Sequence, residues 1–314
     1  MATKPGLGLH LALPLPLIPS LPMARDDASP RWCVALNWLC FLLLCLGVLS
    51  ASQAQAQTPA ASTKRIALVI GNAAYVGEKP LRNPVNDAVD VEAAFKASGL
   101  RVYRHTDLGR KALNQAVEDF MRQAEDADLA IIYFSGHGMQ TSGETFLLPT
   151  DAQIQTERDV RSEGLRLGEL MDDLQGKRVR HSVLILDACR NNPFSTRTRS
   201  TVRGLARPKE MSSAFLVAYA TADGTTADDG AGRNGTYTEQ LLAQMKGANA
   251  RRSLRDIVED TQLAVEAATR GAQSPKTYGD TARFRAVALN PQSNVVPEPV
   301  KPPQLPSQTG GLSL

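Results

Sequence analysis

Two short motifs hold the residues with the chemistry of a nucleophilic site. The first, YFSGHGM at 133–139, has His137 between two glycines, and the second, LILDACRNNPF at 184–194, has Cys189 two positions after an aspartate. A thiol is a strong nucleophile only without its proton, and a nearby imidazole is the usual base. We expect the backbone amides of Gly138 and Cys189 to point at a substrate carbonyl oxygen. The motifs therefore predict a thiol–imidazole pair that attacks a carbonyl carbon.

Each residue alone also has an ordinary structural interpretation. A single cysteine often serves as a small buried apolar residue, and a single histidine often only satisfies polar neighbours. His105 and His181 have no flanking glycines, and no Cys/His spacing matches a metal site. What favours a site is that His137 and Cys189 both directly follow predicted strands. Neighbouring parallel strands lie about 5 Å apart, so their carboxyl ends would bring the two motifs together.

The elements that position these motifs come from an alternation of apolar runs and helical patterns. Strands are predicted at 65–71, 100–105, 128–136, 181–188 and 213–221. Four helices are predicted. One begins at Pro84 with Asn83 as its N-cap, and two others cover 109–125 and 166–175. The fourth begins after an N-cap at Ser253 and places Leu254, Ile257, Thr261, Ala264 and Ala268 on one face. Several strands are apolar at consecutive positions, which suits burial on both faces. The order predicts an α/β fold with a largely parallel sheet and helices on both faces.

The two ends of the chain differ in composition from the part between them. An apolar run at 32–49 follows Arg31 and precedes Ala54-Gln55-Ala56, which is typical of a secretory signal peptide. We therefore expect 1–56 to be a signal peptide region with its true start at Met23, and the alternative is an uncleaved membrane anchor. A linker is expected at 57–63, a folded domain at 64–290 and a disordered Pro-rich tail at 291–314. Export to the periplasm or secretion follows from cleavage.

Composition excludes several classes of function. Three of the four cysteines lie in the N-terminal apolar run, so the chain has no disulfide framework. The net charge is only +3, and no basic stripe is interleaved with aromatic residues, so nucleic acid is not an expected partner. No cofactor motif is present. The sequence contains no EF-hand loop, and DDG at 228–230 is too short a signal to count, so calcium dependence is an open alternative that no motif supports.

The motifs and their flanking segments resemble the caspase-like cysteine peptidases, especially the bacterial metacaspase-like (orthocaspase) branch. The resemblance covers 65–285 and rests on RIALVIGNAAY, LRNPVNDA, YFSGHG, LLPTD, DACRNNPF and AYATADGTTADDG with RNGTYTEQLL, in the family's order. It implies the caspase–hemoglobinase α/β fold and polypeptide substrates. It also implies that His137 and Cys189 form the catalytic dyad, with Gly138 and Cys189 as oxyanion donors.

The resemblance further implies an acidic pocket for a substrate Arg or Lys, formed by Asp87, Ser135 and Asp187. A carboxylate buried at a strand end needs a cationic partner, and a guanidinium supplies one through two hydrogen bonds. For Asp87 the alternative is stabilisation of the first turn of a helix. The chain departs from the metacaspases at 190–192, where Arg-Asn-Asn replaces His-Ser-Gly, and at Pro84, where a pocket cysteine is often found.

The segment after Cys189 is strongly basic. It includes Arg197, Arg199, Arg203 and Arg207, and no acid follows until Glu210. The segment is either a solvated basic loop or a site of self-processing within 195–209. We expect a cysteine endopeptidase that cleaves after Arg or Lys through an acyl-enzyme. The alternatives are a catalytically silent caspase-like binding module in the cell envelope and another thiol-dependent acyl transfer.

Overall fold

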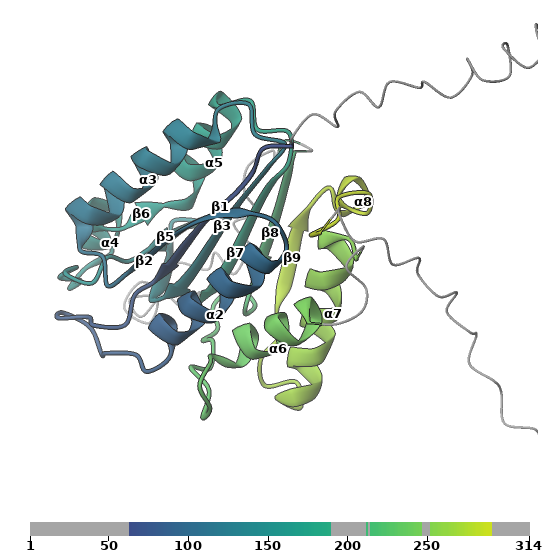
Figure 1. The fold of residues 1–314 in the computed structure, drawn as a ribbon. Helices are drawn as coiled ribbons and strands as arrows, with labels where there is room; N and C mark the ends of the chain where they lie inside the picture. Colours follow the sequence, from purple (N-terminus) through teal and green to yellow (C-terminus); the bar gives the residue numbers. More distant parts are fainter. Residues whose placement is uncertain (1–62, 190–211, 213, 247–251, 291–314) are drawn as a thin grey trace, which may run out of the picture. The chain divides into compact units, whose positions relative to one another are not determined.

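The computed structural model describes residues 63–189, 212, 214–246 and 252–290 (Figure 1). These residues belong to one unit, Ala61–Leu314. Four predictions concern residues outside the described ranges: the signal peptide, the linker up to residue 62, the self-processing arginines and the Pro-rich tail.

A six-stranded sheet forms the centre of the fold, with the strand order β2-β1-β3-β7-β8-β9. Its strands are β1 (Arg65–Gly71), β2 (Arg101–Thr106), β3 (Leu129–Gly136), β7 (Ser182–Ala188), β8 (Phe215–Tyr219) and β9 (Lys276–Gly279). The first five are mutually parallel, whereas β9 pairs antiparallel with β8. The largely parallel sheet is therefore confirmed. The edge strand β9 was not predicted, because its four residues are only partly buried and form no apolar run.

Helices cover both faces of this sheet (Figure 1). One face packs against α2 (Pro84–Ala97), α6 (Thr236–Met245) and α7 (Leu254–Ala268), and the other against α3 (Arg110–Ala124) and α5 (Leu167–Gly176). The short helices α4 (Glu157–Glu163) and α8 (Thr281–Phe284) complete the described set. Successive residues of β3 serve opposite layers, because Tyr133 packs toward α2 and α6 and Phe134 toward α3. Burial on both faces explains the consecutive apolar residues of the parallel strands.

The helix starts agree only in part with the sequence predictions. Pro84 begins α2 as predicted, and Ser253 caps α7 by accepting a hydrogen bond from the amide of Asp256. Asn83 occupies the N-cap position of α2 as predicted, but its side chain makes no capping hydrogen bond and instead donates to the carbonyl oxygen of Asp229. The buried stripe of α7 also differs from the predicted one. Val258 and Val265 are buried, whereas Ala264 and Ala268 are not.

A second, three-stranded sheet begins directly after β3. It contains the antiparallel strands β4 (Gly138–Thr141), β5 (Glu144–Leu147) and β6 (Leu165–Arg166). A two-residue turn joins β4 to β5, and both of its residues, Ser142 and Gly143, have positive φ. Such turns match the twist of a hairpin, and a Ser-Gly pair is a known turn signal. The strands themselves were not predicted, because they have only two to four residues.

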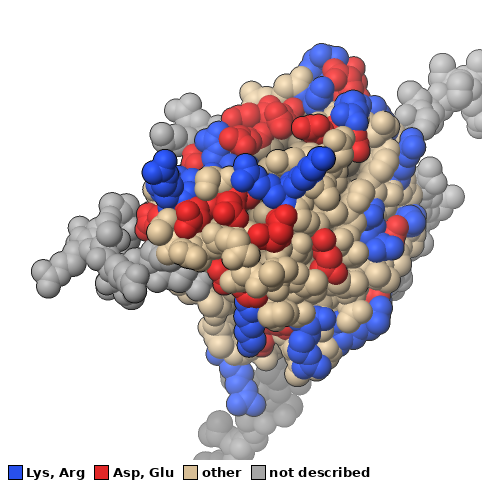
Figure 2. All heavy atoms as spheres, turned by 90° about the vertical axis from the view of Figure 1, so that its left-hand side faces the viewer, with Lys and Arg blue, Asp and Glu red and all other residues tan. Residues whose placement is uncertain are grey.

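One face of the molecule carries no dominant charge. Figure 2 shows basic and acidic side chains interspersed on the face that lies at the left of Figure 1. None of the helices in the described ranges is both long and apolar enough to cross a membrane.

Candidate active site

The carboxyl ends of β3 and β7 bring the two sequence motifs together. The strands are direct neighbours, with Ser135 opposite Asp187 and Gly136 opposite Ala188. His137 and Cys189 are the next residues along each strand. They line one small cavity of about 30 Å³, together with Asp87 and the two opposed residues Ser135 and Asp187. The structure thus unites at one sheet edge all the residues predicted for the dyad and the pocket.

His137 is held in place by its backbone and by its ring. Its Nε2 lies 2.7 Å from the carbonyl oxygen of Lys79. A carbonyl only accepts hydrogen bonds, so Nε2 carries the proton and Nδ1 is the free base of the neutral imidazole. The backbone N–H of His137 donates to the hydroxyl of Tyr75 at 2.8 Å, and that hydroxyl donates to the carbonyl oxygen of Leu148 at 3.2 Å. The rings of Tyr75 and His137 also pack together, with centroids 4.4 Å apart.

Cys189 is half-buried, and its thiol points toward the loop that follows β8. The Sγ atom lies 3.8 Å from the carbonyl oxygen of Ala227, its hydrogen-bond acceptor. Burial raises the pKa of the Cys189 thiol, and repulsion from Asp187 and Asp229 raises this pKa further, against the opposing effect of the hydrogen bond to Ala227. The group therefore rests as a thiol near neutral pH. Its proton must be removed by a base at the moment of attack.

The amide of Gly138 points away from β5 because of its place in β4. His137 and Leu148 form a hydrogen-bonded pair, in which the Leu148 amide donates to the His137 carbonyl at 3.0 Å. Hydrogen-bonded and non-hydrogen-bonded pairs alternate along an antiparallel ladder. The next pair, Gly138 with Leu147, therefore directs the Gly138 amide away from β5. A Cβ atom at Gly138 would lie 2.8 Å from the Cys189 carbonyl oxygen, so only glycine fits beside the cysteine.

Asp87 faces the cavity from the first turn of α2. Its carboxylate is 1% exposed and accepts hydrogen bonds from Ser135 Oγ at 2.9 Å, Asn234 Nδ2 at 3.1 Å and the Gly235 amide at 3.0 Å. None of these donors belongs to α2, which argues against the alternative that Asp87 only stabilises the helix start. Burial raises the pKa of Asp87 to about 6, although its three hydrogen bonds oppose the rise.

Asp187 lies beside Asp87 at the end of β7. It is 7% exposed, and its Oδ2 accepts hydrogen bonds from the amide of Thr238 at 3.2 Å and from the hydroxyl of Thr238 at 2.6 Å. Burial raises the pKa of Asp187 to about 7, and repulsion from Asp87 adds to the rise. The pocket therefore holds its negative charge at a cost that a bound cation would relieve.

The sequence interpretation missed two further aspartates of the cavity lining, Asp228 and Asp229. Both lie in the loop between β8 and α6, and the side chain of Asp229 accepts hydrogen bonds from the amides of Arg82 at 2.7 Å and Asn83 at 3.4 Å. Their sequence signal, DDG at 228–230, had been considered only as a calcium motif. Among the described residues, no group of three or more His, Cys, Asp or Glu is arranged to hold a metal ion.

The described lining of the cavity contains four aspartates and no Lys or Arg. A site with this lining attracts cations and repels anions. The cavity also reaches His137 and Cys189, so a cationic group bound there would place the adjoining bonds next to the thiol.

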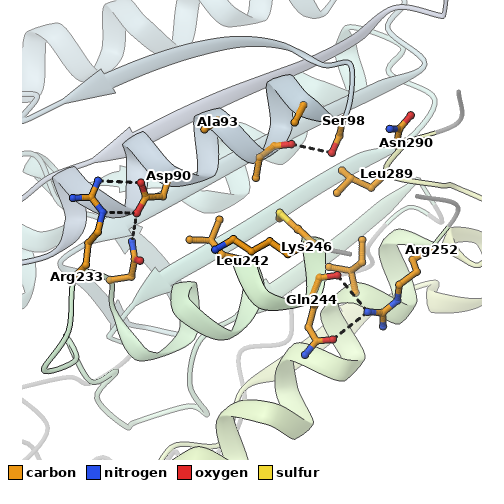
Figure 3. A pocket seen from close by; sticks show the side chains of 15 residues that line it. Asp90, Ala93, Ser98, Arg233, Leu242, Gln244, Lys246, Arg252, Leu289 and Asn290 are labelled. Carbon is orange, nitrogen blue, oxygen red and sulfur yellow. Dashed lines mark hydrogen bonds and ion pairs between the residues drawn. The ribbon is translucent and has the colours of Figure 1, made fainter. Parts of the chain in front are cut away.

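A larger cavity of about 790 Å³ lies between α2, α6 and α7 (Figure 3). Its lining includes Asp90, Arg233, Leu242 and Arg252 but neither His137 nor Cys189. The described residues of this lining contain no cysteine or histidine. The smaller cavity at the strand ends is therefore the candidate active site.

Comparison with known proteins identifies the family of the chain. The family described as "Caspase domain" matches residues 64–286. The chain is 26% identical over 164 residues to human mucosa-associated lymphoid tissue lymphoma translocation protein 1, an alignment that covers 52% of this chain and 19% of that protein. It is 28% identical over 144 residues to a probable protease of a Desulfuromonadales bacterium, with 42% and 17% covered. The aligned part thus spans less than a fifth of either relative. The family match covers most of the chain, and the protein accordingly belongs to the caspase-domain family of cysteine peptidases.

Proposed function

We propose that this protein is an endopeptidase that cleaves polypeptides after Arg or Lys, with Cys189 as nucleophile and His137 as base. The observation that carries the proposal is the cavity in which the thiol–imidazole pair adjoins four aspartates and no described Lys or Arg; the aspartates are Asp87, Asp187, Asp228 and Asp229. A substrate guanidinium or ammonium would enter this cavity and neutralise the buried charges.

The reaction proposed for this geometry has two stages. In the first, Sγ of Cys189 attacks the carbonyl carbon while its proton passes to Nδ1 of His137, and the amides of Gly138 and Cys189 stabilise the oxyanion. The C–N bond then breaks, the leaving amine takes the proton from His137, and a thioester remains on Cys189. In the second stage, a water molecule gives a proton to His137 and attacks the thioester carbonyl carbon. The C–S bond then breaks, the carboxylic acid product leaves, and the Cys189 thiolate takes the proton back from His137.

Hydrolysis of matched fluorogenic peptides tests the proposal. Three peptides that differ only in Arg, Lys or Asp before the cleaved bond are assayed with the wild type, Cys189→Ala and Asp187→Asn. We expect turnover of the Arg and Lys peptides that Cys189→Ala abolishes and Asp187→Asn weakens. Preference for Asp would refute the acidic pocket. Absence of any turnover that depends on Cys189 would instead support the silent binding module.

We also propose self-processing in the basic segment that contains Arg197, Arg199, Arg203 and Arg207. An Arg-selective peptidase presents here a run of cleavable bonds directly after its own nucleophile. Denaturing gels of the purified wild type and Cys189→Ala test this, with two fragments expected only from the wild type. Identical single bands would contradict it.

Export remains a proposal that rests on the apolar run and the small residues near Ala56. Sequencing the N-terminus of the protein recovered from cells tests it. We expect a start at Gln57, whereas a start at Met1 or Met23 would contradict cleavage.

A further inference from the structure

One asparagine connects the specificity pocket to the surface of α2. Nδ2 of Asn234 donates to Asp87 Oδ1 at 3.1 Å and to Asp90 Oδ2 at 3.0 Å. Asp87 and Asp90 are three residues apart on α2 and so lie on neighbouring positions of one helix face. The two N–H bonds of a single amide group are therefore both directed to carboxylates.

Asp90 is itself held from the other side by Arg233. The guanidinium donates to both carboxylate oxygens, at 2.9 and 3.0 Å, and Figure 3 shows this two-pronged contact at one end of the larger cavity. The hydrogen bonds from Arg233 lower the pKa of Asp90, so Asp90 stays ionised. Arg233 is 60% exposed, and an exposed ion pair of this kind contributes little stability by itself. Its effect here is to fix Asp90, which in turn fixes Asn234.

The backbone beside Asn234 lies directly over the pocket. The amide of Gly235 donates to the same oxygen of Asp87 at 3.0 Å. A Cβ atom at Gly235 would lie 3.0 Å from Asp187 Oδ2 and 3.3 Å from Asp87 Oδ2. The same loop also contains Asp229 of the cavity lining. Displacement of this loop would therefore disturb Asp87, Asp187 and Asp229 at once.

We infer that Asn234 is a positioning residue of the specificity pocket, which orients Asp87 and the loop 228–235 for a basic substrate side chain. The inference rests on the proposed function of the site. Within the described ranges, His137 and Cys189 make their hydrogen bonds to Tyr75, Lys79 and Ala227, and neither depends on Asn234 for one. Its loss should therefore weaken substrate binding and leave the chemical step intact.

The chain offers a matched control. The side chain of Asn86 also ties this loop to α2, by donating to the carbonyl oxygen of Arg233 at 3.1 Å, but it is not among the hydrogen-bond donors to the Asp87 carboxylate. Asn234→Ala should raise KM for an Arg peptide about ten-fold or more, because hydrogen bonds to a charged group are the strong ones. Asn86→Ala should change KM by no more than about two-fold, since it removes one neutral hydrogen bond. In both variants kcat should stay close to that of the wild type.

Two further measurements separate positioning from general damage. The rate at which iodoacetamide alkylates Cys189 reports an intact thiol–imidazole pair without using the pocket, and it should be the same in all variants. Asp90→Ala frees Asn234 without touching Asp87, and it should raise KM by about three-fold through looser orientation. Asp90→Ala keeps the inference testable if Asn234→Ala does not fold.

The outcomes distinguish the inference from the proposed function. If the wild type cleaves Arg peptides and Asn234→Ala behaves like Asn86→Ala, the inference is overturned and the function stands. A fall in kcat and in alkylation rate at unchanged KM would also overturn it. If the wild type is alkylated at Cys189 but cleaves no basic peptide, the proposed function fails and the inference fails with it.

Discussion

The paired carboxylates of the pocket should make the protein less stable at high pH, and Asp187→Asn should remove much of this penalty. Burial raises the pKa of Asp187 from its ordinary value of 3.8 to about 7. A group whose pKa is higher in the folded state binds its proton more tightly there, so folding is favoured at low pH and loses free energy as the pH rises. The penalty begins above pH 3.8 and is complete above about pH 7.

The size of the effect follows from this interval. A difference of about three pH units corresponds to about 4 kcal/mol of unfolding free energy, at about 1.4 kcal/mol per unit. Part of the penalty is repulsion from Asp87, which the pair shares, so we expect Asp187→Asn to gain about 2–4 kcal/mol at pH 8. The asparagine carbonyl can still accept both hydrogen bonds from Thr238.

Urea unfolding followed by circular dichroism measures the gain. Both proteins should carry Cys189→Ala, so that no proteolysis occurs during the measurement. The advantage of Asp187→Asn should grow between pH 5 and pH 8, whereas the exposed control Asp172→Asn should show no such trend. An advantage that is equal at both pH values, or a less stable variant at pH 8, would refute the reasoning. With Cys189 present, the same substitution should weaken cleavage after Arg, because function requires the charge that stability disfavours.

Three other perturbations test the remaining parts of the site. KM for an Arg peptide should fall as the pH rises from about 5 to 8, because the pKa values of Asp87 and Asp187 lie at about 6 and 7 and only their ionised forms attract the guanidinium. Gly138→Ala should lower kcat by about 100-fold, because the added Cβ would lie 2.8 Å from the Cys189 carbonyl oxygen and displace an oxyanion donor. Tyr75→Phe should lower kcat/KM by about ten-fold, because the His137 amide loses its acceptor.

Each of these predictions has a control. A peptide with citrulline in place of Arg should show no rise in affinity with pH, and an equal rise for both peptides would contradict the role of the carboxylates. Gly168→Ala places its Cβ in open space on α5 and should leave kcat unchanged. Tyr103→Phe removes an exposed hydroxyl that donates to Gln123 at 3.4 Å and should be silent. Equal losses in the paired variants would refute the proposed roles of Gly138 and Tyr75.

The sequence alone determined the class of the fold and pointed to His137 and Cys189 as the candidate reactive pair. Consecutive apolar residues at 129–134 and 183–186 can be buried on two faces only in a covered parallel sheet, and the motifs with His137 and Cys189 end those runs. Carboxyl ends of parallel strands share one edge, so the placement of the pair needed only that β3 and β7 be neighbours. Asp87, Ser135 and Asp187 were likewise found from sequence, through the resemblance of their motifs to the caspase-like family.

Only the tertiary structure decided which groups support these residues. The carbonyl of Lys79, the hydroxyl of Tyr75, and the side chains of Asp229 and Asn234 come from loops, where no periodicity marks which side chains turn inward. Asn234 meets Asp87 across 147 residues of sequence, and such a contact exists only after the strands have ordered and α2 has packed on them. Sequence patterns reveal helices and strands because burial of one or both faces makes their apolar residues recur at regular spacing. Loop residues have no such spacing, and which of them contact a buried carboxylate depends on the hydrogen bonds that the carboxylate requires in the folded protein.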